Sequence, residues 1–406
     1  MPDSRHESLI ADAAGLNDLI DHIREERRFG FDTEFVSEDT YEPVLCLIQV
    51  ATSRRLAAVD PLALAAGDLD AFWAVVLDPE IEVVMHAAGE DMRICLMRTG
   101  KLPARVFDVQ LAAGLVGYSY PLSHTNLVSQ VLRATVSGSE TRTDWRRRPL
   151  TPAQVRYALD DVRYLLDLQD RLGAELDRLG RREWAEAEFR DFMVAVEERA
   201  DQDRWRRLPG LHQLSRRALE AARRLSEWRE GEARRQNRPM RQVMRDDLVV
   251  AIAKRMPNGR RDLEALRDFN RPGLISRADE ILKAVEAARG VPDDQLPEPA
   301  PRHDDAPGAS TVANLLSAAL AQCCLENKVA GSLVANTSDL KSLIRWRLDG
   351  CPGGERPILA EGWRGEMCGG LLLDVLDGRR TLRVVDPASE FPVALEPTRT
   401  EETPGR

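Results

Sequence analysis

The hydrophobic pattern near the start of the chain predicts short strands separated by helices. Three strand-like apolar segments lie at 29–35, 45–50 and 56–59. Two shorter apolar runs, at 83–85 and 106–107, are each followed by a helical pattern. We therefore expect a mixed α/β domain in which three strands form a meander and two more alternate with helices.

Helical periodicity dominates the rest of the chain. Thr151 and Pro152 supply an N-cap and a first-turn proline for a helical stretch that continues to about residue 196. In a second block, 211–288, Pro and Gly clusters separate four or five short helices, which is typical of a small bundle. Further helices are expected at 312–326, 337–347 and 360–368, and a strand at 381–386.

The stretch VPDDQLPEPAPRHDDAPG at 291–308 is rich in Pro and Asp and poor in apolar residues, which is typical of a linker. Together with the periodicity it divides the chain into five segments. These are an α/β domain at 1–200, a helical domain at 208–290, a linker at 291–309, a second helical domain at 310–390 and a disordered tail at 391–406.

The distribution of charge along the chain says more about possible partners than the net charge does. The chain carries a formal charge of −10, which taken alone argues against a nucleic-acid partner. The stretch 201–260, however, holds 16 Arg and Lys against 8 Asp and Glu. We therefore expect an acidic protein with one basic module that can bind phosphates.

The six cysteines form no CxxC pair and are too sparse for a disulfide scaffold, so we expect free thiols in a reducing compartment. The N-terminal segment lacks a secretory signal, and no apolar run is long enough to cross a membrane. The expectation is a cytoplasmic protein without a membrane partner.

Two acids on one strand provide the first candidate chemistry. Asp32 and Glu34 are two residues apart in FDTEF, so the period of a strand places both side chains on one face. Burying like charges is costly unless a cation lies between them, and a divalent metal ion would satisfy that need. The alternative is an exposed strand end with ordinary surface acids.

Three further residues extend this set. Asp91 stands at the start of a predicted helix, where carboxylates are also common as caps. Tyr157 and Asp161 are one helical turn apart, although spacing alone does not exclude Asp160. Four acids from strand and helix positions can converge on two divalent metal ions, and hard oxygen ligands favour Mg²⁺ or Mn²⁺.

At these residues the chain resembles ribonuclease D, in the DEDD superfamily of exonucleases with a tyrosine in the third motif. The matching motifs are FDTEF at 31–35, HAAGEDMRIC at 86–95 and YALDDVRYL at 157–165, and FDVQLAA at 107–113 and TRTDWRRRPLT at 141–151 are also similar. The resemblance implies a ribonuclease H-like exonuclease domain. It assigns metal ligation to Asp32, Glu34, Asp91 and Asp161, with Tyr157 orienting the attacking water. The Tyr-to-Asp spacing of four selects Asp161 over Asp160.

The resemblance continues beyond the nuclease. LSEWREGEARRQNRPMRQVMRDDLVVAIAKRMP at 225–257 resembles the helical HRDC domain that ribonuclease D shares with RecQ helicases. LKSLIRWRLDG at 340–350 and LAEGWRGEM at 359–367 resemble, more weakly, a second such domain. The implied fold is an α/β exonuclease domain followed by all-α helical-bundle HRDC domains.

The activity that the resemblance implies is a 3'–5' exoribonuclease that removes 5'-mononucleotides from RNA 3' ends by two-metal hydrolysis, in tRNA 3' processing. Expected substrates are tRNA precursors and small structured RNAs with single-stranded 3' ends, and a monomer is the default state. A 3'–5' DNA exonuclease and a catalytically silent RNA-binding scaffold are the rival hypotheses.

Candidate RNA contacts fall into two groups. Thr33 and Phe35 lie beside the acids, where an aromatic ring can stack on a terminal base, although core packing is the alternative for Phe35. The basic module offers exposed arginines for phosphate binding, with a solvated helix surface as the alternative. The arginines chosen are Arg216, Arg217, Arg234 and Arg235.

Overall fold

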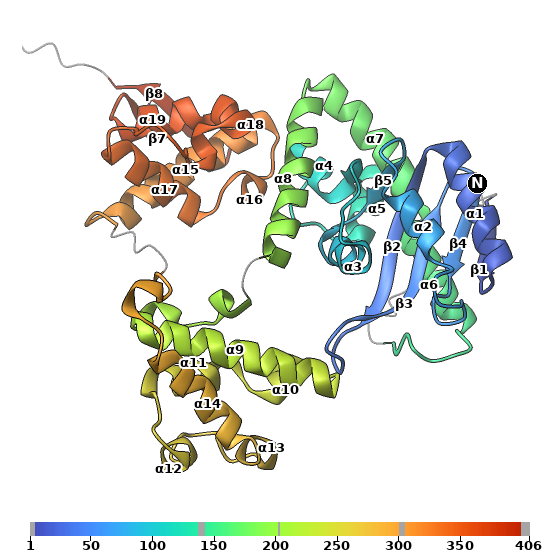
Figure 1. Cartoon of the computed structure of the whole chain (residues 1–406). Helices are drawn as coiled ribbons and strands as arrows, with labels where there is room; N and C mark the ends of the chain where they lie inside the picture. The colour runs from blue at the N-terminus through green and yellow to red at the C-terminus, as the bar shows by residue number, and fades with distance from the viewer. Residues whose placement is uncertain (1–4, 137–142, 202–203, 300–304, 399–406) are drawn as a thin grey trace, which may run out of the picture.

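The computed structural model describes residues 5–136, 143–201, 204–299 and 305–398. An α/β domain (blue to green in Figure 1) is followed by two helical domains, yellow to light orange and deep orange to red, which lie at different places beside it. The predicted order, with a mixed α/β domain first and helical domains after it, is confirmed.

The α/β domain is built on a six-stranded sheet with strand order β1-β4-β3-β2-β5-β6. The strands are β1 (His6–Ile10), β2 (Arg28–Val36), β3 (Val44–Ala51), β4 (Arg55–Val59), β5 (Glu82–Met85) and β6 (Val106–Asp108).

The central strands β2, β3 and β4 form the expected antiparallel meander, and β5 and β6 extend the sheet in parallel. The sequence pattern missed β1, which pairs in parallel with β4 at the sheet edge. Its residues are largely exposed, with Leu9 at 46%, so it carries no clear hydrophobic signal.

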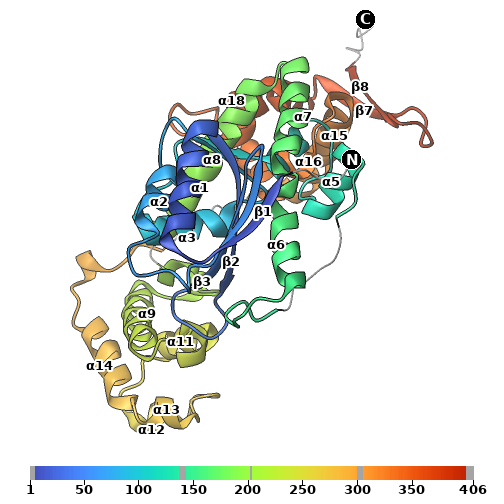
Figure 2. The same cartoon turned by 90° about the vertical axis from the view of Figure 1, so that its right-hand side faces the viewer.

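Helices cover both faces of the sheet, as the turned view in Figure 2 shows for α1 and α2 on one side and α6 and α7 on the other. One layer contains α1 (Ala13–Glu26), α2 (Asp70–Val76) and α3 (Gly89–Thr99). The other contains α4 (Val109–Leu115), α5 (His124–Leu132), α6 (Pro152–Arg163), α7 (Leu165–Arg178) and part of the long α8 (Arg182–Asp201).

The first helical domain has its own hydrophobic core, separate from that of the α/β domain. Its helices are α9 (Arg216–Gln236), α10 (Met240–Val243), α11 (Asp246–Arg255), α12 (Arg260–Glu264), α13 (Pro272–Ile275) and α14 (Ala278–Arg289). The prediction of four or five short helices is wrong, because α9 runs for 21 residues and five shorter helices follow it. Its side chains meet the α/β domain at the β2–β3 loop, where the Tyr41 hydroxyl bonds Glu230 at 2.5 Å.

The second helical domain shares a core with the layer of the α/β domain that contains α4 to α8. It contains α15 (Ala309–Asn327), α16 (Gly331–Val334), α17 (Thr337–Leu348), α18 (Gly362–Arg364), α19 (Gly370–Leu376) and a hairpin of β7 (Arg380–Val384) and β8 (Val393–Pro397).

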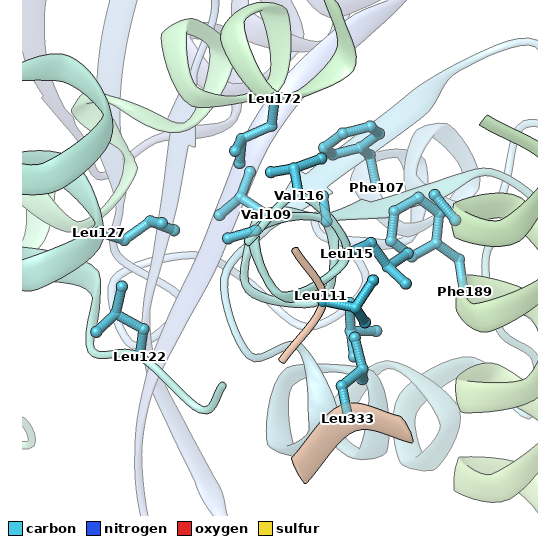
Figure 3. Packing of buried hydrophobic residues seen from close by; sticks show 14 of the residues in the cluster. Phe107, Val109, Leu111, Leu115, Val116, Leu122, Leu127, Leu172, Phe189 and Leu333 are labelled. Atoms are coloured by element: carbon cyan, nitrogen blue, oxygen red, sulfur yellow. The ribbon is translucent and has the colours of Figure 1, made fainter. Parts of the chain in front are cut away.

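Figure 3 shows how this shared core packs, with Leu333 of α16 beside Leu111 of α4 and close to Phe189 of α8. Arg364 and Glu188 form an ion pair of 2.8 Å across the same interface. Apolar packing and this ion pair therefore attach the second helical domain to the α/β domain.

Two predicted segment boundaries need correction. The tail at 391–406 begins too early, because β8 pairs with β7 along its whole length, and residues 399–406 lie outside the described part of the chain. The first part of the linker at 291–309 packs on the first helical domain, since Leu296 is 7% exposed and its carbonyl accepts a hydrogen bond from Arg216. Local interactions with arginine, which composition does not report, order this part of the segment.

Candidate active site

The strand β2 presents Asp32 and Glu34 on the face of the sheet that α6 covers. Alternate residues of β2, such as Phe29 and Phe31, belong to the hydrophobic core of the opposite face. Asp32 and Glu34 pair across the ladder with Gln49 and Leu47, and Leu47 belongs to the core under α6. The predicted placement of both acids on one face is therefore confirmed by the register.

A glycine lets α6 and α7 come close to this strand. A Cβ atom built on Gly30 would lie 3.2 Å from the Cβ atoms of both Ala51 and Leu165. Leu165 follows Asp161 by four residues, across the junction of α6 and α7 at Tyr164, so the close approach at Gly30 brings the end of α6 with Asp161 toward the strand acids. The electrostatics agree with this placement, because burial and then the charge of Asp161 raise the pKa of Glu34.

The neighbouring acid points elsewhere. Asp160 forms an ion pair of 2.7 Å with Arg163, while Asp161 interacts electrostatically with Asp32 and Glu34. The geometry therefore agrees with Asp161, and not Asp160, as the acid that faces β2.

Asp91 reaches the same cluster from the first turn of α3. It does not cap the helix, because Ala88 occupies the N-cap position and no side chain caps there. The Thr33 hydroxyl donates to the Asp91 carboxylate at 2.5 Å, and Asp91 is 7% exposed. The buried Asp108 accepts from the backbone N–H groups of Ala87 and Ala88 and so holds the turn that precedes α3.

Burial and mutual repulsion raise the pKa of every acid in the cluster. Burial first, and then the charges of Asp161 and Asp91, raise the pKa of Glu34 to about 8. Burial likewise raises the pKa of Asp161 to about 7 and that of Asp91 to about 6. The pKa of Asp32 is raised well above its usual range, first by burial and then by the charge of Asp91.

This donor set fits divalent cations. Burial and the charges of Asp161 and Asp91 all raise the pKa of Glu34, so among the described residues no arginine or lysine neutralises this carboxylate. Within the described ranges, no three His, Cys, Asp or Glu side chains are already arranged as a metal site. Carboxylate rotamers adjust easily to a cation whereas backbone positions do not, so the shared placement of these acids is what suits them to divalent ions.

Tyr157 lies beside Asp161, and its ring packs near the ring of Trp145. The Trp145 ring lies 6.1 Å from the Tyr157 ring, and Tyr157 hydrogen-bonds Asp161. Burial and the neighbouring acids raise the pKa of Tyr157, so its hydroxyl stays protonated at neutral pH. The predicted residues Asp32, Glu34, Asp91, Tyr157 and Asp161 are thus brought together.

Several supporting residues escaped the sequence interpretation. Arg148 forms a two-bond ion pair with the buried Asp60, at 2.5 and 2.7 Å, and also donates to the Cys46 carbonyl. These bonds tie the Trp145 segment to β3 and β4. The polar Gln49 inside the apolar run LCLIQVA was a detectable signal, and its side chain is fully buried.

The candidate RNA-binding residues differ in their exposure and in the partners that they already have. Thr33 is 6% exposed and its hydroxyl is engaged with Asp91, while Phe35 is half-buried at the edge of the core. Arg216 and Arg217 bond carbonyls of Leu296 and Val291 inside the chain. The side chains of Arg234 and Arg235 remain 68% and 58% exposed near Glu230 and Glu232. Arg234 also donates to the Tyr41 hydroxyl, and Arg235 donates twice to Glu232, so phosphate contact by either pair would compete with intramolecular bonds.

Comparison with known families agrees with this geometry. A 3'–5' exonuclease family model matches residues 8–177, and an HRDC domain model matches residues 218–285. The first match contains all five residues of the acid and tyrosine cluster, and the second lies inside the first helical domain. In the part of the chain that the structure covers, no helix is long and apolar enough to span a membrane.

Individual proteins extend the similarity over most of the chain. Ribonuclease D of Gluconacetobacter diazotrophicus is 34% identical over 93% of this chain and 94% of its own length. Ribonuclease D of Escherichia coli is 30% identical over 91% of this chain and 98% of its own length. The crystal structure of Escherichia coli RNase D, described as an exoribonuclease involved in structured RNA processing, superposes with a TM-score of 0.79 and covers 92% of this chain and 99% of that chain.

Proposed function

Because this chain belongs to the ribonuclease D family of hydrolytic 3'–5' exoribonucleases, we propose that Asp32, Glu34, Asp91 and Asp161 bind two divalent metal ions. Exonucleases of this family depend on divalent metals. The pair of ions, and Mg²⁺ or Mn²⁺ as their identity, belong to the proposal. The observation that carries it is the cluster of partly to fully buried acids from β2, α3 and α6 whose pKa values are all raised.

The residues around the acids have distinct roles in this proposal. Bound divalent ions supply Lewis-acid activation of water and stabilise the leaving 3'-oxygen. Tyr157, kept protonated by its raised pKa, hydrogen-bonds the attacking water and holds it in line. Thr33 orients Asp91 through its hydroxyl, and Trp145 limits the motion of the Tyr157 ring.

For substrates we propose tRNA precursors and small structured RNAs with single-stranded 3' ends. Phe35 follows Asp32 and Glu34 on β2, partly buried against the core of the opposite face, and is the residue proposed to stack on a base. Arg234 and Arg235, which are largely exposed, offer charge for phosphates. The proposal extends to a cytoplasmic monomer, and six free cysteines support a reducing compartment.

The test is a digestion of a 5'-labelled tRNA that carries extra 3' nucleotides, with Mg²⁺, Mn²⁺ or EDTA. We expect stepwise shortening that requires metal and is lost in Asp161→Asn. The matched control is Asp160→Asn, which removes the neighbouring acid that pairs with Arg163 and should leave shortening in place. Loss of activity in both variants, or in neither, would overturn the assignment of Asp161.

A parallel digestion of DNA oligomers with the same single-stranded length tests the rival substrate. Equal rates on RNA and DNA would show that the site does not select ribose. The RNA contacts are tested by charge reversal, with Arg234→Glu and Arg235→Glu together expected to weaken binding and lower its salt dependence. An unchanged salt slope would remove these two residues from the proposed interface.

A further inference from the structure

The centre of β3 contains a buried amide without a partner. Gln49 is 0% exposed, and both its Oε1 and Nε2 atoms are buried without a hydrogen-bond partner among the described residues. An unsatisfied buried amide is destabilising, and such groups are rare in folded proteins. A strand with Leu47, Ile48 and Val50 around it would be more stable with an apolar residue here, so the amide calls for a functional explanation.

The register of the sheet places this amide next to the acid cluster. Gln49 is the direct antiparallel partner of Asp32. Side chains at paired positions project from the same face of a sheet, with Cβ atoms about 4.5–5.5 Å apart. The neighbouring Leu47 and Ala51, which share the face of Gln49, pack in the core under α6, the helix that carries Asp161. The Gln49 amide is therefore within reach of the Asp32 carboxylate.

The two groups are chemically complementary. An ionised carboxylate only accepts hydrogen bonds, and a glutamine amide offers two N–H donors. Among the described side chains, none donates to Asp32, whereas Asp91 already has the Thr33 hydroxyl. Carboxylates that ligate metals are usually held by such outer hydrogen bonds.

We propose that Gln49 is a positioning residue whose amide N–H, unpaired without metal, donates to Asp32 when metal is bound and holds that carboxylate in the orientation that binds metal. This inference rests on the proposed metal site. The arrangement matches the role of Thr33 at Asp91, so two of the four acids would each have a dedicated donor on the sheet. Gln49 contacts neither RNA nor the reacting atoms and acts through Asp32.

The decisive variant is Gln49→Met, which keeps the side-chain length and removes both polar atoms. In EDTA we expect a higher Tm, by about 2–4 °C, because an unpaired buried amide is replaced by an apolar group. Calorimetric titration with Mn²⁺ should show affinity weakened by about 10–100-fold, the range typical for loss of an outer hydrogen bond to a metal ligand. The rise in Tm that Mn²⁺ produces should shrink accordingly.

A double-mutant cycle tests whether the effect passes through Asp32. In an Asp32→Asn background, Gln49→Met should cause no further loss of the residual Mn²⁺ affinity. The control Ile48→Val alters the adjacent side chain on the opposite face, and should lower Tm slightly without changing Mn²⁺ affinity. Additive losses in the cycle would overturn the proposal.

Other outcomes are equally decisive. Unchanged Mn²⁺ affinity in Gln49→Met would overturn the role of Gln49 while leaving the metal site intact. A lower Tm in EDTA, or failure of Gln49→Met to fold, would show that the amide has a structural partner and would also overturn it. If the unmodified protein bound no Mn²⁺ at all, the proposed metal site itself would fail.

Discussion

The sheet face under α1 and α2 is lined by apolar side chains, whereas the face under α6 carries Asp32, Glu34 and Gln49. On the first face Phe29, Phe31 and Phe72 pack with ring centroids 6.1–6.4 Å apart. On the second, like charges and an unpaired amide are buried together. Both faces belong to the same strands, so β2 stabilises the fold with one set of residues and holds a destabilising functional cluster with the alternate set.

The largest expected effect is a loss of catalytic rate when an acid on the sheet face under α6 is replaced. Glu34→Gln removes a proposed metal ligand, so the loss should exceed the 10–100-fold effect of an outer partner, and we expect about 10³-fold or more. The rate of nucleotide release from a labelled RNA in Mn²⁺ measures it. Retention of most activity would show that Glu34 is not a metal ligand. The claim that the sheet face under α6 serves catalysis would then fail.

Substitutions on the apolar face of the sheet should lower the stability of the fold. Phe31→Ala deletes a fully buried ring that contacts Phe29, Phe72 and Trp73, and should lower the free energy of unfolding by about 3–5 kcal/mol. Activity per folded molecule should change little, because the ring faces away from the acids. Denaturant unfolding and active-site titration separate the two quantities, and a large specific loss of activity would contradict the division between faces.

A smaller loss of catalytic rate is expected from a substitution at Gly30, where the start of α7 comes close to β2. Gly30→Ala places a methyl group 3.2 Å from Leu165 Cβ and Ala51 Cβ, so α7 and the end of α6 must shift by a few tenths of an ångström. Displacing Asp161 by this amount should reduce the rate about tenfold, since larger misplacements cost about 10²-fold. The expected Mn²⁺ affinity falls with it. An unchanged rate would show that the close approach does not set the position of Asp161.

The smallest expected effect is a pH dependence of stability in EDTA. The folded-state pKa values of Asp91, Asp161 and Glu34, about 6, 7 and 8, lie above the ordinary 3.8, 3.8 and 4.5. Their contribution to stability is thus fully present below the ordinary values and is lost as pH rises through the raised ones. Tm in EDTA should fall by a few degrees between pH 5 and about pH 8.

Two controls apply to this measurement. Saturating Mn²⁺ should remove most of the fall, because bound cations compensate the ionised acids. Glu34→Gln should also flatten the upper part of the curve in EDTA. A Tm in EDTA that rises over the same pH range would contradict the raised pKa values of the cluster.

Sequence periodicity predicted the meander, the helical blocks and the shared face of Asp32 and Glu34, because these depend on residues close in sequence. The edge strand β1 and the strand β8 were missed, since their residues are largely exposed or intermediate and carry little hydrophobic contrast. The first part of the linker was misjudged because composition does not show that Arg216 and Arg217 bind its backbone.

Motif resemblance identified the family and the five central residues, and it chose Asp161 where spacing left Asp160 open. It did not identify Gln49, and it included Trp145 and Arg148 in the similar segment TRTDWRRRPLT without showing their contacts with Tyr157 and Asp60. The arginines of the basic module illustrate the same limit. Their charge is visible in the sequence, but which of them are already engaged inside the chain is not.

The amino-acid sequence alone thus determined the class of fold, the family and the chemical identity of the site, because strand and helix periods and short motifs are local properties. Only the tertiary structure decided that the start of α7 approaches β2 at Gly30, that Asp161 faces the acids of β2, and that Gln49 lies opposite Asp32. These depend on strand register and on packing between segments separated by up to about 135 residues, which a local pattern cannot encode.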